Sequence, residues 1–172
     1  MDARLHHVQG KAERVKPSEL LALLQNFSLE RLRLMTEHQM SARRVGQYHF
    51  NNTYQYVIAR EETQLQWVAD AIVRLGGLVP DPGPVADRGP ASEHQVIEAD
   101  LELERTFVDR WQPRVQQVTN ARDRKMLEII LGESLEHARL FAEAVAGHTD
   151  LLGRSKTDAG ERGTVLADRW VE

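Results

Sequence analysis

The chain has 172 residues, enough for one domain with a sizeable apolar core. Its 41% apolar and 28% charged residues are typical of a globular protein in water, and no apolar run approaches the ~20 residues of a membrane span. A formal net charge of −4 gives no reason to expect a nucleic-acid partner. Cysteine is absent, so any metal must be held by carboxylates and histidines. The polar N-terminus lacks the apolar stretch of a signal peptide, which predicts a cytoplasmic protein.

The first predicted helix follows a polar arm. Residues 1–16 show no clear pattern, and we expect an N-terminal arm there. Pro17 suits the first turn of a helix. Apolar residues then recur at helical spacing as far as Val45, with Glu30 in the same row, and Gly46 is the expected break.

A second helix is predicted from Tyr48 to the glycine pair at 76–77, a typical C-terminal stop. Glu62 lies on its predicted apolar face. Residues 78–91 contain four prolines, which exclude a helix or a strand there. This segment is longer than a helix–helix turn requires and favours a crossover that leaves the second and third helices parallel. A surface excursion between antiparallel helices is the alternative.

The third helix is predicted to begin at a capping box formed by Ser92 and Gln95. Its apolar face contains Glu104, and Pro113 predicts a kink or local distortion further along. A tight turn is expected near Asn120.

The fourth helix is predicted over residues 123–146 and ends at Gly147. Glu133 and His137 continue its apolar face, so an acid and an imidazole lie within a buried stripe. An unpaired buried carboxylate is costly, and a partner, a proton or a metal ion is therefore expected beside it. The tail, residues 148–172, ends with apolar residues that we expect to dock or to form a dimer.

Counting residues from the predicted turns places the core-facing polar residues at the same level along the bundle axis. Glu30 and Glu62 are equally far from Gly46, and Glu104 and His137 are equally far from the turn near Asn120. A crossover then brings the two hairpins into register to within one helical turn. Five residues are the candidate metal ligands: Glu30, Glu62, Glu104, Glu133 and His137.

Residues 17–147 resemble the ferritin-like carboxylate bundles, the superfamily of bacterioferritin, rubrerythrin and the di-iron oxidases. The most specific matches are Ala59-Arg-Glu-Glu62-Thr-Gln-Leu65-Gln-Trp-Val with Ile72-Val-Arg-Leu-Gly-Gly77, and the stretch 132–141. The resemblance implies an all-α, up-down-down-up four-helix bundle. It also implies a dinuclear metal site to which two helices each give one Glu and two give a Glu-x-x-His pair.

Two departures from this pattern change the expected ligand set. Leu65 stands where the second helix of the family offers a histidine, and Ser134 stands three residues before His137, where the family has an acid. The site could therefore hold two irons, one ion or none.

Other side chains leave alternatives open. Glu37 and His38 could form a further ligand pair, although a solvated or capping role is favoured. Glu102 or Glu136 could replace Glu104 or Glu133 if the helical phase is shifted. The remaining acids near the core, Glu61 and Glu98, are interpreted as charged flanks of their helices.

Two main functions follow from these expectations. The first is a ferritin-like protein that binds iron, or alternatively manganese, and works as a ferroxidase or small oxidase. The second is a degenerate scaffold without a full di-metal site that acts as a structural or interaction protein. A bundle that holds an organic ligand in its core is a weaker alternative. We also expect a homo-oligomer, most simply a dimer; no catalytic residue is assigned.

Overall fold

The computed structural model describes residues 17–86, 89 and 91–153. Four long helices account for most of this part: α1 (Pro17–Ala42), α2 (Tyr48–Arg74), α3 (Glu93–Gln116) and α4 (Ala121–Val145). The predicted arm at 1–16 and the apolar end of the tail lie outside the described residues. The dimer, which was predicted from that tail, stays a prediction.

The ends of the helices follow the signals in the sequence. Ser92 and Gln95 form the predicted capping box of α3, and Asn120 caps α4 by accepting a hydrogen bond from the Asp123 amide. At the end of α2, the Gly77 amide donates to the Ile72 carbonyl while Gly76 adopts a φ of 77°. This is the Schellman arrangement, which favours glycine at the left-handed position.

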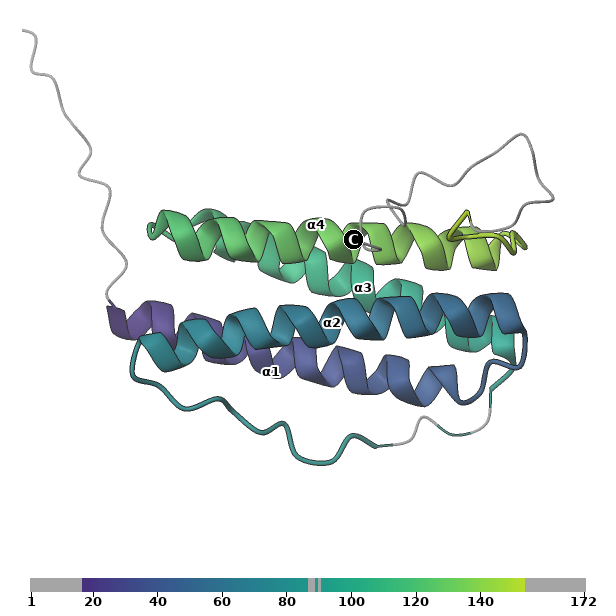
Figure 1. Cartoon of the computed structure of the whole chain (residues 1–172), viewed down its shortest axis with the longest axis horizontal. Coiled ribbons are helices and arrows are strands. Elements are labelled where there is room, and N and C mark those ends of the chain that lie inside the picture. Colours follow the sequence, from purple (N-terminus) through teal and green to yellow (C-terminus); the bar gives the residue numbers. More distant parts are fainter. Residues whose placement is uncertain (1–16, 87–88, 90, 154–172) are drawn as a thin grey trace, which may run out of the picture.

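The proline-rich segment is a crossover, as predicted. The Gln25 amide donates to the Leu78 carbonyl, which holds the beginning of the segment beside the first part of α1. At its other end, Glu93 accepts hydrogen bonds from the amides of Gly46 and Gln47, so α3 begins beside the α1–α2 turn. Helices α2 and α3 therefore begin at the same end and run parallel, which gives the up-down-down-up order (Figure 1).

The bundle packs as two hairpins, α1 on α2 and α3 on α4, with further contacts between α1 and α3 and between α2 and α4. Pro113 lies inside α3, which continues for three more residues to Gln116. Beyond α4, Leu151 and Leu152 are buried against the bundle. No helix in the described part of the chain combines the length and apolar character needed to cross a membrane.

The apolar core consists of two clusters. One surrounds Phe27, Trp111 and Leu127, near the end where α1 begins. The other surrounds Tyr54, Val57 and Phe141, near the end where α2 begins. Buried polar side chains lie between them, and they form the candidate site.

Candidate functional site

A polar layer crosses the middle of the bundle, with side chains from all four helices. Each of its members exposes at most 1% of its surface, which is unusual for charged residues. The polar layer consists of Arg31, His38, Glu61, Gln64, Asp100, Glu104, Ser134 and His137.

Arg31 lies at the centre of one half of the layer. Its Nε and Nη2 atoms donate to Gln64 Oε1 over 3.0 and 2.7 Å, and its Nη1 atom donates to Ser134 Oγ over 2.9 Å and to Glu104 Oε2 over 3.3 Å. Glu61 Oε1 lies 3.6 Å from the same Nη1 atom. We call the oxygens of Glu61, Gln64, Glu104 and Ser134 the Arg31 cage. These oxygens come from three helices and surround one buried positive charge.

His38, Glu61 and Glu104 form the other half of the layer, which we call the His38 group. The Nδ1 atom of His38 lies 3.0 Å from both carboxylate oxygens of Glu61. Burial lowers the pKa of His38, but the adjacent Glu61, together with Glu104 and Asp100, outweighs burial and raises the pKa from 6.5 to about 9. The other ring nitrogen, Nε2, is buried without a hydrogen-bond partner among the described residues.

Glu104 joins the two halves. Its Oε2 atom accepts from Arg31, and its Oε1 atom lies 3.0 Å from His137 Nδ1. Burial raises the pKa of Glu104, but Arg31 and His137 outweigh burial and lower the pKa from 4.5 to about 2. Glu104 is therefore ionised at neutral pH and takes part in both halves of the layer.

Two contacts extend the layer. Tyr54 donates to Asp100 over 2.6 Å, within the cluster near the start of α2. On the opposite side, Gln64 donates to Glu133 over 2.5 Å, and Arg60 forms a two-point ion pair with the same carboxylate. Since the side chain of Glu133 is 25% exposed, Glu133 lies at the edge of the layer rather than in it.

Of the five residues predicted as ligands, the structure brings Glu104 and His137 together in the layer and Glu133 to its edge. Glu30 lies elsewhere, because its carboxylate accepts hydrogen bonds from Trp111 and Arg110. Glu62 is exposed, and the preceding residue, Glu61, is buried in its place. Their assignment as metal ligands stays a prediction.

The structure corrects the expectations for two other residues and adds a third that was not predicted. Glu61 belongs to the core rather than to a charged flank, and His38 is fully buried rather than solvated. Arg31 was missed altogether, because an arginine is not expected inside a core unless partners are already known. A shift of one residue rotates a side chain by about 100° around the helix but moves it by only ~1.5 Å along the axis. On α1 and α2, the level of the polar residues along the bundle axis was therefore predicted correctly, although the face of the helix was not.

The polar layer does not fit a dinuclear metal centre. The buried positions that face it hold Arg31 on α1, Gln64 three residues after Glu61 on α2, and Ser134 three residues before His137 on α4. A guanidinium is a cation, and an amide or a hydroxyl adds no negative charge. Two divalent ions would therefore meet too few anionic ligands and a competing positive charge.

A single ion fits better. One ligand atom each from His38, Glu61 and Glu104 lies within 4.8 Å of the others, and all three residues are buried. Two ligands of one ion stand up to about 4.4 Å apart, twice a ~2.2 Å bond, so a small contraction would bring the three into one coordination shell. The His38 group could thus hold one metal ion.

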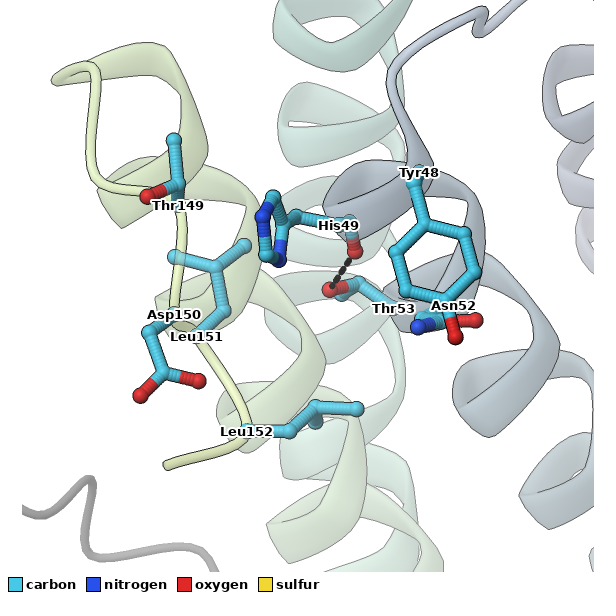
Figure 2. A pocket seen from close by; sticks show the side chains of 8 residues that line it. All are labelled: Tyr48, His49, Asn52, Thr53, Thr149, Asp150, Leu151 and Leu152. Carbon is cyan, nitrogen blue, oxygen red and sulfur yellow. Dashed lines mark hydrogen bonds between the residues drawn. The ribbon is translucent and has the colours of Figure 1, made fainter. Parts of the chain in front are cut away.

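A separate pocket of about 310 Å³ lies at one end of the bundle, between the start of α2 and residues 149–152 (Figure 2). Tyr48 and His49 line it on the α2 side, with Asp150 and Leu151 opposite. None of its lining residues belongs to the polar layer. This pocket therefore does not support the interpretation of an organic ligand within the core.

Comparison with known proteins identifies the fold. No protein-family model and no curated protein sequence matches the chain. Among solved structures, it is similar to a ferritin-like, diiron-carboxylate protein from Bacillus anthracis strain Ames, with a TM-score of 0.64 and 16% identity over 75% of this chain and 96% of that one. The resemblance inferred from the sequence is thus confirmed for the architecture: the chain has the ferritin-like, all-α four-helix bundle fold.

Proposed function

We propose that this chain is a ferritin-like metal-binding protein that holds one divalent ion, iron or manganese, at the His38 group. The observation that carries the proposal is the buried cluster of one imidazole and two carboxylates with ligand atoms within 4.8 Å of one another. The second ring nitrogen of His38, Nε2, is buried without a partner among the described residues, so the imidazole keeps one unused ligand atom.

The donor set favours these metals. Two carboxylates and one imidazole suit Fe²⁺ or Mn²⁺ better than a soft ion. The similar Bacillus anthracis protein is described as a diiron-carboxylate protein, which supports iron as the first metal to test. Bound iron would supply redox chemistry with dioxygen or peroxide, and the proposal therefore extends to ferroxidase-like or small-oxidase activity.

The chain's own residues would prepare the site for the ion. His38 must release its proton to become a ligand, and Glu61, which raises its pKa to about 9, keeps that proton in place below this pH. Arg31 and His137 each hold one oxygen of Glu104, which fixes the orientation of this carboxylate. We therefore expect metal affinity to increase with pH up to about 9.

A metal-free scaffold is the second candidate, and the pairing of charges around Arg31 and His38 favours it. Arg31 and a protonated His38 carry two positive charges that match the two carboxylates of Glu61 and Glu104. Because these charges are paired and hydrogen-bonded, the core can be stable without an added ion.

Metal-dependent stability separates the two candidates. The metal content of protein purified from cells grown with iron and manganese is measured first, and the melting temperature is then followed with and without Mn²⁺. The proposal expects bound metal and a rise in melting temperature that His38→Ala and Glu61→Ala abolish. Glu62→Ala is the matched control, because Glu62 neighbours Glu61 but is exposed, and it should keep the rise. Absence of both metal and stabilisation in the wild-type protein would favour the scaffold.

Oxidase chemistry has its own test. Aerobic oxidation of added Fe²⁺ is followed by absorbance for the wild-type protein, His38→Ala and Glu62→Ala. We expect faster oxidation with wild type and Glu62→Ala than with His38→Ala. Equal rates for the three proteins would leave metal binding without ferroxidase activity.

A further inference from the structure

We propose that Arg31 determines how many cations the core can hold: its guanidinium fills an oxygen cage that would otherwise accept a divalent ion. The statement that the core then holds only one ion rests on the proposed function. The cage can be tested separately, because a cation that enters in place of Arg31 does not require an ion at the His38 group.

The first reason is the environment of the guanidinium. Four side-chain oxygens from three helices lie between 2.7 and 3.6 Å from its nitrogens: those of Glu61, Gln64, Glu104 and Ser134. Carboxylate, amide and hydroxyl oxygens are also the ligands that hard divalent cations take. The Arg31 cage therefore has the composition of a cation site, and the cation within it belongs to the protein.

The second reason is that the cage is held in place from outside. The side-chain amide nitrogen of Gln64 donates a hydrogen bond to Glu133. This contact turns the Gln64 carbonyl oxygen toward Arg31. His137 holds the other oxygen of Glu104, and His38 holds Glu61. The oxygens of Gln64, Glu104 and Glu61 would therefore keep their orientation if the guanidinium were removed, which makes most of the cage preorganised.

The third reason is electrostatic. The guanidinium already occupies the space among the cage oxygens and neutralises them, so a divalent ion could bind there only in its place. Without the guanidinium, the carboxylates of Glu61 and Glu104 each lose a cationic partner while staying fully buried. A replacement cation should then be bound, because buried charges must be paired.

Arg31→Met tests this inference, since methionine replaces the apolar stem and removes the charge. Mn²⁺ binding is measured by calorimetry and by metal content after gel filtration, and folding by circular dichroism. We expect Arg31→Met to bind one more Mn²⁺ per chain than the wild-type protein. Its melting temperature should fall by about 10 °C without metal and recover by a similar amount with Mn²⁺.

Two controls make the test specific. Arg33→Met removes an exposed arginine of the same helix and should match the wild-type protein in stoichiometry and stability. Arg31→Lys keeps a positive charge without the planar fork, so it should lose stability but gain no Mn²⁺. If Arg31→Met folds only in the presence of Mn²⁺, that rescue supports the inference; failure to fold even then counts against it.

The stoichiometries separate this inference from the proposed function. One ion in the wild-type protein and two in Arg31→Met support both. No ion in the wild-type protein and one in Arg31→Met support the cage and overturn the proposed function. Equal numbers in the two proteins, or two ions in the wild-type protein, overturn the inference about Arg31.

Discussion

The two halves of the polar layer differ in how completely their hydrogen bonds are satisfied. Around Arg31, every nitrogen of the guanidinium donates to an oxygen in the cage. In the His38 group, one ring nitrogen of a fully buried imidazole has no partner among the described residues. A buried polar atom without a partner carries a desolvation cost that a hydrogen bond or a metal would remove. The first half is therefore closed by hydrogen bonds within the protein, whereas the second keeps one nitrogen open to a further partner.

Glu104 links the two halves, and its removal should have the largest effect. Glu104→Leu leaves Arg31 and His137 without their shared carboxylate, and breaking such a buried pair typically costs about 3–5 kcal/mol. Chemical denaturation measures the free energy of unfolding. Glu102→Leu, at an exposed position of the same helix, should change it by less than about 0.5 kcal/mol. Similar losses in the two variants would mean that the layer is not coupled through Glu104.

The pH dependence of the free energy of unfolding should show the contribution of His38, in the open half of the layer. The pKa of His38 is raised from 6.5 in the unfolded chain to about 9 in the folded one, so the folded state binds this proton more tightly. The contribution of about 3 kcal/mol is complete below pH 6.5 and is lost as the pH rises through about 9. Urea unfolding at fixed pH values between 6 and 10 checks it.

Substitution of His38 tests whether this residue causes the loss of stability at alkaline pH. We expect His38→Gln to flatten the stability curve over this range, whereas His49→Gln, at an exposed position, should keep the wild-type curve. Glu104 gives the opposite dependence at acid pH, because its pKa falls from 4.5 to about 2 on folding. Its contribution is present above pH 4.5 and is lost as the pH falls toward 2. An alkaline loss that persists in His38→Gln would place the titrating group elsewhere.

The sequence predicted the fold better than the polar layer because the two depend on different signals. Helix ends and the crossover follow from local chemistry: the glycine stop at 76–77, the prolines of 78–91 and the capping box at Ser92 each act within a few residues. The face of α3 was also predicted correctly, since its apolar residues from Ile97 to Val115 fit one helical row that includes Glu104.

The faces of α1 and α2 were less certain for a physical reason. On α1, residues 30 and 31 both fit the row between Phe27 and Leu34, but only Glu30 was placed in it. On α2, apolar residues occupy two adjacent rows, so the row with Glu62 and Leu65 competed with the buried one that contains Glu61 and Gln64. Only the partners on the other helices decide between such rows, and a single sequence does not show them.

Tyr54 tests whether the layer extends beyond the His38 group. Its hydroxyl donates to Asp100 over 2.6 Å, and its ring lies 6.2 Å from that of His38. Tyr54→Phe removes only the hydroxyl, and we expect a loss of about 1.5–3 kcal/mol, typical of a hydrogen bond to a charged group. Tyr48→Phe is the control, because Tyr48 is 74% exposed. A loss below about 0.5 kcal/mol in Tyr54→Phe would mean that the hydrogen bond contributes no more than a surface one.

The smallest effect is expected at the edge of the Arg31 cage. Glu133 is paired with Arg60 and accepts from Gln64, but its partial exposure screens these contacts. Glu133→Gln should therefore cost about 1 kcal/mol or less in the free energy of unfolding. If Glu133 orients Gln64 toward Arg31, the effects of Glu133→Gln and Arg31→Met should not add. Once Arg31 is replaced by methionine, Gln64 has no guanidinium from which to accept hydrogen bonds, so its orientation no longer affects stability. Chemical denaturation of the two single variants and the double variant measures this coupling. Strict additivity would mean that the cage holds its shape without support from the edge of the layer.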